Sequence, residues 1–99
     1  MNLNLSNFKP KDLNGQEYPV PDLSKTLGNA LYLECQTIEQ EDLARAIHKG
    51  EEFEISEESL DLLISFLEQK TIIRRWIQSQ VLDHLKSLKK EKENLEVSE

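Results

Sequence analysis

The apolar positions between residues 56 and 90 follow the period of two helices. In the first, they stand at i, i+3, i+4 and i+7: Leu60, Leu63, Ile64 and Leu67. In the second, a helical spacing continues after Thr71 through Ile73, Ile77, Val81, Leu85 and Leu88. The pattern predicts helices over 57–69 and 72–90, joined near Lys70, with broad apolar faces that need cover.

The preceding segment predicts two further helices, over 23–35 and 38–49. Asp22 or Ser24 can cap the first, and Gly28 either weakens it by about 1 kcal/mol or allows a neighbouring helix to approach closely. Thr37 and Gln40 have the spacing of a capping box, and Gly50 is a typical residue to end a helix. An extended link, in which acids alternate with Phe53 and Ile55, should then lead to the third helix.

The N-terminal segment has the features of a small hairpin or an ordered arm over residues 2–20. Leu3 and Leu5 alternate with polar residues, which indicates a short, half-buried strand. The Asp-Leu-Asn-Gly sequence at 12–15 is the strongest turn signal in the chain, and residues 16–20 can form a return strand. The predicted fold is mainly α, with four helices in a small bundle.

Composition is consistent with one folded domain followed by a charged tail. The chain has 99 residues, of which 37% are hydrophobic and 31% charged, and these values exclude wholesale disorder. We therefore divide the sequence into an N-terminal hairpin or arm (1–21), a helical domain (22–90) and a charged flexible tail (91–99). The N-terminus lacks the features of a signal peptide and no apolar run is long enough for a membrane helix, so we expect a cytoplasmic protein.

The net charge of −7 argues against general affinity for nucleic acid, although its sign changes along the chain. Residues 34–68 contain eleven acids and two bases, a net of −9, whereas residues 70–92 contain seven bases and two acids, a net of +5. The split either guides head-to-tail self-association or forms ordinary solvated faces. A homodimer through the last helix and a monomer are both compatible with the sequence.

Catalytic and metal-binding patterns are missing from the sequence. Cys35 is a single cysteine, expected on the buried side of its helix, and with His48 and His84 it does not have the spacing of a zinc site. No nucleophile sits beside a recognisable base, and no glycine-rich phosphate loop is present. We expect no metal, no cofactor and no enzymatic activity.

One local group has the composition of a protein-binding surface: Arg74, Arg75, Trp76 and Gln80. Arginine and tryptophan are enriched among the residues that contribute most to protein interfaces. Trp76 and Gln80 are one helical turn apart and share a side. In the alternative interpretation, Trp76 belongs to the core stripe with Ile77 while the arginines face water.

Several short motifs resemble a class of small phage and prophage proteins. They are Asp-Leu-Asn-Gly at 12–15, Leu-Gly-Asn-Ala-Leu at 27–31, Asp-Leu-Ala-Arg-Ala-Ile at 42–47, Glu-Ile-Ser at 54–56 and Gln-Val-Leu-Asp-His-Leu at 80–85. The resemblance spans roughly residues 12–85. It implies an accessory protein that acts through protein contacts, without a catalytic site.

Two functional hypotheses follow. The first is a non-enzymatic phage or prophage accessory protein that binds another protein, of the phage or of the host, in virion assembly or host takeover. The second is an acidic regulator that mimics or competes with nucleic acid on a basic host protein, for which the acidic segment 34–68 is the motivation. Direct DNA binding by the basic last helix is a weaker third alternative, because the rest of the chain would repel phosphate.

Overall fold

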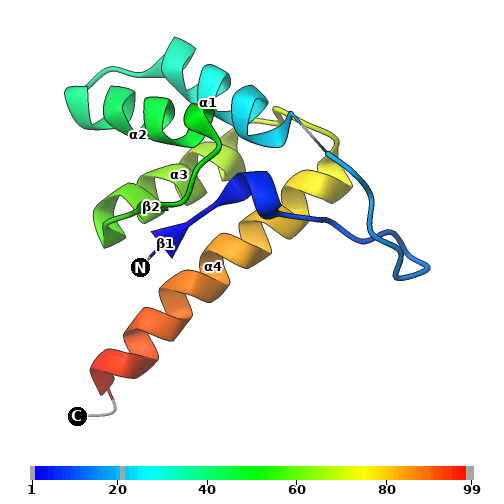
Figure 1. Ribbon diagram of the computed structural model, residues 1–99. Helices are drawn as coiled ribbons and strands as arrows, with labels where there is room; N and C mark the ends of the chain where they lie inside the picture. The colour runs from blue at the N-terminus through cyan, green and yellow to red at the C-terminus, as the bar shows by residue number, and fades with distance from the viewer. Residues whose placement is uncertain (1, 21, 98–99) are drawn as a thin grey trace. The chain divides into compact units, whose positions relative to one another are not determined.

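The chain folds into two compact units, residues 2–53 (the N-terminal unit) and residues 54–99 (the C-terminal unit). The computed structural model describes residues 2–20 and 22–97, with the side chains of 2–20 and 22–90. Over the described residues there are four α-helices and two short strands, which confirms the predicted mainly α fold (Figure 1). No helix in this part of the chain is long and apolar enough to cross a membrane.

The N-terminal unit is built around a helical hairpin. Helices α1 (Leu23–Glu34) and α2 (Ile38–Lys49) pack against each other, and a 3₁₀ turn, η1 (Leu5–Asn7), contacts α1. The apolar side chains buried on these two helices are Leu23, Leu27, Leu31, Leu43, Ala44 and Ile47. Two predicted helices are therefore confirmed, with the first ending one residue earlier than expected.

Gly28 is the point of closest approach between α1 and α2. A Cβ placed on Gly28 would lie 2.7 Å from the His48 backbone nitrogen and 2.8 Å from its Cα. Such distances are too short for any real side chain, so the glycine lets the two helix backbones approach each other. Of the two interpretations of Gly28, the structure supports close packing.

The α2 helix begins and ends as the sequence predicts. The Thr37 Oγ1 accepts a hydrogen bond from the Gln40 backbone N–H at 3.1 Å, and the Gln40 Oε1 accepts one from Gln36 N–H at 2.7 Å. Side chains thus satisfy backbone donors at the N-terminus that the helix itself leaves unpaired. At the other end Gly50 has a φ of 74°, the left-handed conformation that glycine adopts without steric cost.

The start of α1 differs from the prediction. Asp22 occupies the N-cap position but makes no capping hydrogen bond through its side chain. Ser24 lies inside the first turn, is only 4% exposed, and its hydroxyl has no hydrogen-bond partner among the described residues. Neither predicted cap therefore functions as one, because the helix begins with Leu23 directed into the core.

The orphaned hydroxyl leads to a stability prediction. Replacing Ser24 with alanine should leave the free energy of unfolding unchanged or raise it by about 1 kcal/mol, since it removes a buried polar group that lacks a partner and improves helix propensity. Urea unfolding followed by circular dichroism measures the change. A loss of more than about 1 kcal/mol would show that the hydroxyl has a stabilising partner after all.

The predicted turn at residues 12–15 is present and well braced. The Asp12 Oδ1 accepts hydrogen bonds from the backbone N–H groups of Asn14 and Gln16 at 2.9 and 3.0 Å, and Gly15 has a φ of 82°. The flanking chain pairs through one antiparallel bridge, between Lys11 and Glu17. The longer return strand over 16–20 does not form: strand β1 (Asn2–Leu3) pairs instead with β2 (Phe53–Glu54), which begins in this unit.

The C-terminal unit consists of α3 (Glu57–Gln69) and α4 (Arg75–Val97) in contact with each other. The Ser56 Oγ caps α3 by accepting a hydrogen bond from Ser59 N–H at 3.1 Å. Most of the predicted apolar stripe residues are buried: Leu60, Leu63, Ile64, Leu67, Ile77, Val81 and Leu85. Two are only half-buried, Ile73, which precedes α4, and Leu88. Acids of α3 also pair with bases of α4, Asp61 with Lys89 at 2.7 Å and Glu68 with Lys86 at 3.7 Å.

Helix α4 begins three residues later than predicted and extends further. Residues 70–74 are not helical, and the first turn is closed by hydrogen bonds from Ile77 and Gln78 N–H to the Arg74 carbonyl. The helix continues to Val97, beyond the predicted end at residue 90. The side chains of the predicted tail, 91–99, lie outside the described residues, as does the backbone of 98–99. The division of the sequence at residues 21 and 90, which rested on composition, stays a prediction.

Candidate functional site

The four residues predicted as a binding surface lie together at the start of α4. Arg74 and Arg75 are exposed, whereas Trp76 and Gln80 are half-buried. Arg75 also lines a hollow of about 200 Å³ with Thr71, Glu68 and Lys86 among its neighbours. The arginines therefore face water, and Trp76 is neither a fully buried core residue nor a fully exposed one. Use of this surface for binding stays a prediction.

A neighbouring glutamine that the sequence analysis did not single out holds this surface in place. Gln78 is 6% exposed, and its Oε1 accepts hydrogen bonds from the backbone N–H groups of Ile72 and Ile73 at 2.8 and 3.2 Å. Its Nε2 donates to the carbonyls of Leu67 and Lys70, both at 2.6 Å. One side chain thus satisfies four backbone groups of the α3–α4 connection. The one available signal was a glutamine directly after the apolar residue Ile77.

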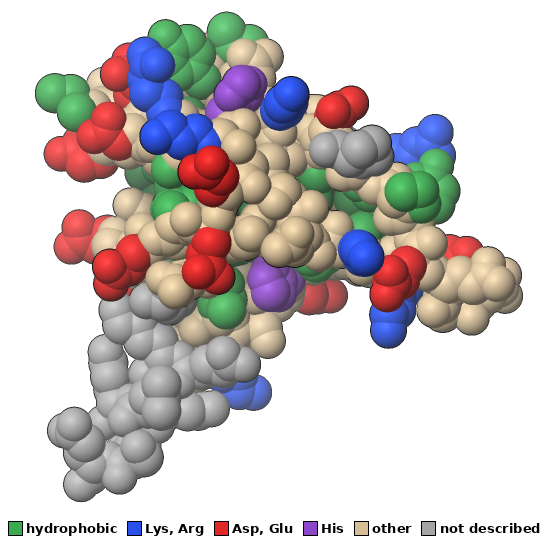
Figure 2. All heavy atoms as spheres, viewed as in Figure 1, with side chains coloured by type: hydrophobic (Ala, Val, Ile, Leu, Met, Phe, Trp, Pro, Cys, Tyr) green, Lys and Arg blue, Asp and Glu red, His purple; other side chains and the backbone are tan. Residues whose placement is uncertain are grey.

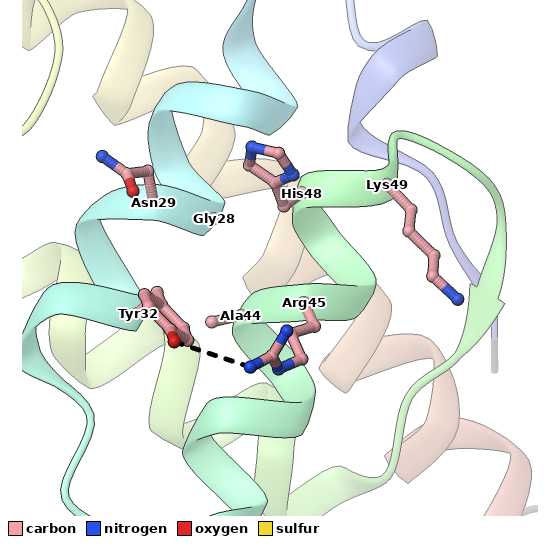
Figure 3. A pocket seen from close by; sticks show the side chains of 7 residues that line it. All are labelled: Gly28, Asn29, Tyr32, Ala44, Arg45, His48 and Lys49. Atoms are coloured by element: carbon pink, nitrogen blue, oxygen red, sulfur yellow. Dashed lines mark hydrogen bonds between the residues drawn. The ribbon is translucent and has the colours of Figure 1, made fainter.

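The N-terminal unit contains a groove along α1 and α2, with a volume of about 470 Å³. Its floor is made by two small buried residues, Gly28 and Ala44. Asn29 and Tyr32 of α1 and Arg45, His48 and Lys49 of α2 complete the lining (Figure 3). The groove therefore lies beside the point where Gly28 lets the two helices approach most closely.

Tyr32 and Arg45 face each other across this groove (Figure 3). The Arg45 Cζ lies 5.2 Å from the centroid of the Tyr32 ring, and the Arg45 Nη2 donates a hydrogen bond to the Tyr32 hydroxyl at 3.5 Å. One turn earlier on α2, a carboxylate oxygen of Glu41 lies 3.6 Å from the Arg45 Nε. A cation over an aromatic face is attracted by the negative charge density of the ring, so three interactions orient this guanidinium.

Large apolar side chains are exposed at the end of the same helical hairpin. Leu33, in the last turn of α1, and Ile38, the first residue of α2, are each 74% exposed, and Tyr32 is 41% exposed. Leu33 and Ile38 stand on either side of the short connection 35–37. We call Tyr32, Leu33 and Ile38 the corner patch. Figure 2 shows hydrophobic side chains exposed at separate points of the α1–α2 end, with acidic and basic side chains between them and a histidine nearby.

Cys35 lies beside this patch and differs from its predicted position. It is half-buried and directly follows α1, where its backbone N–H bonds to the Tyr32 carbonyl, so it is not a core residue of the helix. In the part of the chain that the structure describes, no group of three or more His, Cys, Asp or Glu side chains is placed to hold a metal ion.

Comparisons with known proteins identify no relative: no family model, no curated protein and no solved structure matches the chain. The resemblance to phage and prophage proteins rests on the short sequence motifs alone.

Proposed function

We propose that this protein works by binding another protein through the corner patch of the N-terminal unit. The observation that carries the proposal is the exposure of Leu33 and Ile38, 74% each, at the two ends of one helix connection. Burying a side chain of this size stabilises a complex by about 1.5–3 kcal/mol. Tyrosine and arginine are enriched among the residues that contribute most to protein interfaces, and exposed apolar side chains beside them add surface that a partner can bury.

The chemical character of the surroundings supports a protein as the partner. Tyr32 and Arg45 contact each other, with the Arg45 Cζ 5.2 Å from the ring centroid, and this contact favours one arrangement of the two side chains before binding. Side chains that are already oriented lose less conformational entropy when a complex forms. The phage and prophage resemblance extends the proposal to an accessory protein of that class, with a phage or host protein as partner and no catalytic role.

Affinity capture from phage-bearing and phage-free bacterial cells tests the proposal. The unchanged chain should retain a defined protein at moderate salt, and a double variant with Leu33→Ser and Ile38→Ser should lose at least about 90% of that capture, as expected when two buried anchors are removed. Both residues are exposed, so the variant should keep the circular dichroism spectrum of the parent chain.

A second double variant, Arg75→Ala with Trp76→Ala, tests whether the partner binds the surface at the start of α4 and not the corner patch. If the corner patch binds, this variant should capture the partner as the parent does. Loss of capture with the α4 variant and retention with the corner variant would overturn the assignment and favour the surface predicted from the sequence. Absence of any captured protein with the parent chain would contradict the proposed function itself.

The acidic-mimic hypothesis has less support from the geometry. In the C-terminal unit Asp61 and Glu68 are paired with Lys89 and Lys86, and these pairs reduce the negative charge that α3 presents to a cationic partner. Binding of that kind should collapse between low and moderate salt, because screening acts strongly on exposed charges. The salt dependence of capture distinguishes the two functions.

A further inference from the structure

We propose that the groove of Gly28, Tyr32, Arg45 and His48 binds an acidic peptide segment, with a partner carboxylate at the Arg45 guanidinium. The inference rests on the proposed function, because the groove lies next to the corner patch and would take the polar part of the same partner. The proposed function rests on apolar residues of the corner patch, and this inference adds that the partner presents acidic residues beside them.

The charge of the groove is opposite to that of the chain. The protein carries a net charge of −7, yet the described residues that line the groove include two cations, Arg45 and Lys49, and no carboxylate. The nearest acid with a described contact to one of them is Glu41, which lies outside the lining with an oxygen 3.6 Å from the Arg45 Nε. Asn29 adds a side-chain amide that can donate hydrogen bonds. An anionic group is therefore attracted to this groove locally, although the rest of the chain repels it.

Arg45 is positioned to receive a carboxylate. Glu41 approaches its Nε at 3.6 Å, and Tyr32 accepts a hydrogen bond from Nη2 at 3.5 Å. A guanidinium has five N–H donors, so these two long contacts leave donors for a ligand. Paired N–H groups of arginine match the two oxygens of a carboxylate, and the contact with Tyr32 keeps the Arg45 guanidinium near the groove, with its Cζ 5.2 Å from the ring centroid.

The size of the groove suits a short peptide segment. Its volume of about 470 Å³ can hold several side chains, and its small-residue floor lets a peptide lie close to both helices. The Tyr32 ring offers an apolar wall for an aliphatic or aromatic residue of that segment. Lys49 also belongs to the lining, although in Figure 3 its side chain points away from Tyr32 and Arg45, which leaves Arg45 as the cation nearest the Tyr32 ring.

Titration of the full-length chain with a capped peptide, acetyl-Glu-Leu-Glu-Phe-Glu-amide, tests the inference by ¹⁵N NMR at low ionic strength. We expect saturable shifts at the Arg45 Nε–H and at the backbone amides of Gly28, Asn29 and His48. The matched glutamine peptide should bind at least about threefold more weakly, as expected for the loss of exposed ion pairs.

Variants locate the binding. Arg45→Gln should raise the dissociation constant for the acidic peptide by about threefold or more. Arg45→Lys keeps the charge, so its dissociation constant should lie between that of Arg45→Gln and that of the parent chain. Arg75→Gln removes the same charge from the surface at the start of α4 and should leave the affinity unchanged. Equal weakening by Arg45→Gln and Arg75→Gln would show general charge attraction and overturn the inference.

A further experiment compares the affinity of the groove for the acidic peptide with its affinity for a single-stranded nucleic acid. An oligothymidylate of similar charge should bind more weakly than the acidic peptide, and tighter binding of the oligonucleotide would overturn the assignment to a protein segment. If the peptide produces no shifts while the corner-patch variant still loses its captured partner, this inference fails and the proposed function stands. If the peptide binds and no partner depends on the corner patch, the proposed function fails instead.

Discussion

Replacing Gly28 with alanine should lower the free energy of unfolding by about 2 kcal/mol or more. The added methyl would lie 2.7–2.8 Å from backbone and Cβ atoms of His48, so α1 and α2 would have to separate. Forcing extra atoms into a packed interface typically costs about 1–3 kcal/mol. Backbone atoms cannot rotate away as the end of a flexible side chain can, which places the cost at the upper part of that range. Urea unfolding followed by far-UV circular dichroism measures it.

The sign of this effect makes the test sharp. In a solvent-exposed helix the same substitution would stabilise the protein by about 1 kcal/mol, because alanine is the better helix former. The neighbouring Asn29→Ala is the matched control: it adds helix propensity on an exposed side of α1 and should leave stability within about 0.5 kcal/mol or raise it slightly. A stabilised Gly28→Ala variant would contradict the close approach of the two helices and remove the reason for the groove beside it.

Replacing Gln78 with alanine should lower the free energy of unfolding by about 3 kcal/mol. The substitution leaves two backbone N–H groups, of Ile72 and Ile73, and two carbonyls, of Leu67 and Lys70, without their partner. Each buried backbone group that loses a partner costs about 1–3 kcal/mol, and water can reach the part-buried ones and recover some of that cost. Denaturant unfolding gives the total, and amide hydrogen exchange at Ile72 and Ile73 should show a local loss of protection.

Gln69→Ala is the matched control for this prediction. Gln69 is exposed on α3 and bonds only to the Ser65 hydroxyl, at 3.2 Å, among the interactions that the structure describes, so its loss should change stability by about 0.5 kcal/mol or less. If Gln78→Ala were as mild as this control, the glutamine would not be what orders residues 70–74.

The variant Gln78→Glu adds a pH dependence with a definite sign. The introduced carboxylate would keep the acceptor for Ile72 and Ile73, but its second oxygen would face two carbonyl oxygens. Because the charged form is disfavoured there, the pKa of this carboxyl would be higher in the folded state than in the unfolded state. The variant should therefore be relatively more stable at low pH and lose stability as the pH rises through the folded-state pKa. A pH-independent difference from the parent chain would contradict this geometry.

The two candidate binding surfaces belong to different units, and this makes them experimentally separable. The corner patch and the groove lie on the α1–α2 hairpin of the N-terminal unit. In the C-terminal unit, α4 contains Arg75, Trp76 and Gln80, and Arg74 directly precedes it. A substitution in one unit thus changes one surface. The capture and titration experiments can assign a partner to one surface without disturbing the other.

Features that depend on near neighbours in the chain were predictable from the sequence. The four helices, the Thr37 and Ser56 caps, the Gly50 terminus and the turn at 12–15 each depend on residues within about one or two helical turns of each other. Their signals are the hydrophobic period and the conformations that particular residues favour. The surface at the start of α4 was also predictable as a set of neighbours, although its use in binding was not.

Tertiary packing determined what the local pattern left open. Residues 2–20 were predicted to form either a small hairpin or an ordered arm. The strand that contains Leu3 pairs with residues 53–54 and not with a nearby return strand, because ladder hydrogen bonds depend on which segment is brought alongside and not on distance along the chain. The predicted start of α4 was three residues too early. The Gln78 side chain accepts the hydrogen bonds from Ile72 and Ile73 N–H, so these residues need not continue the helix. Similarly, Tyr32 and Arg45 are thirteen residues apart and meet because Gly28 allows α1 and α2 to approach closely. The sequence by itself determined the helices and their inward faces. The groove, the α3–α4 connection that Gln78 holds by hydrogen bonds and the strand pairing arose from contacts that exist only once those helices have packed.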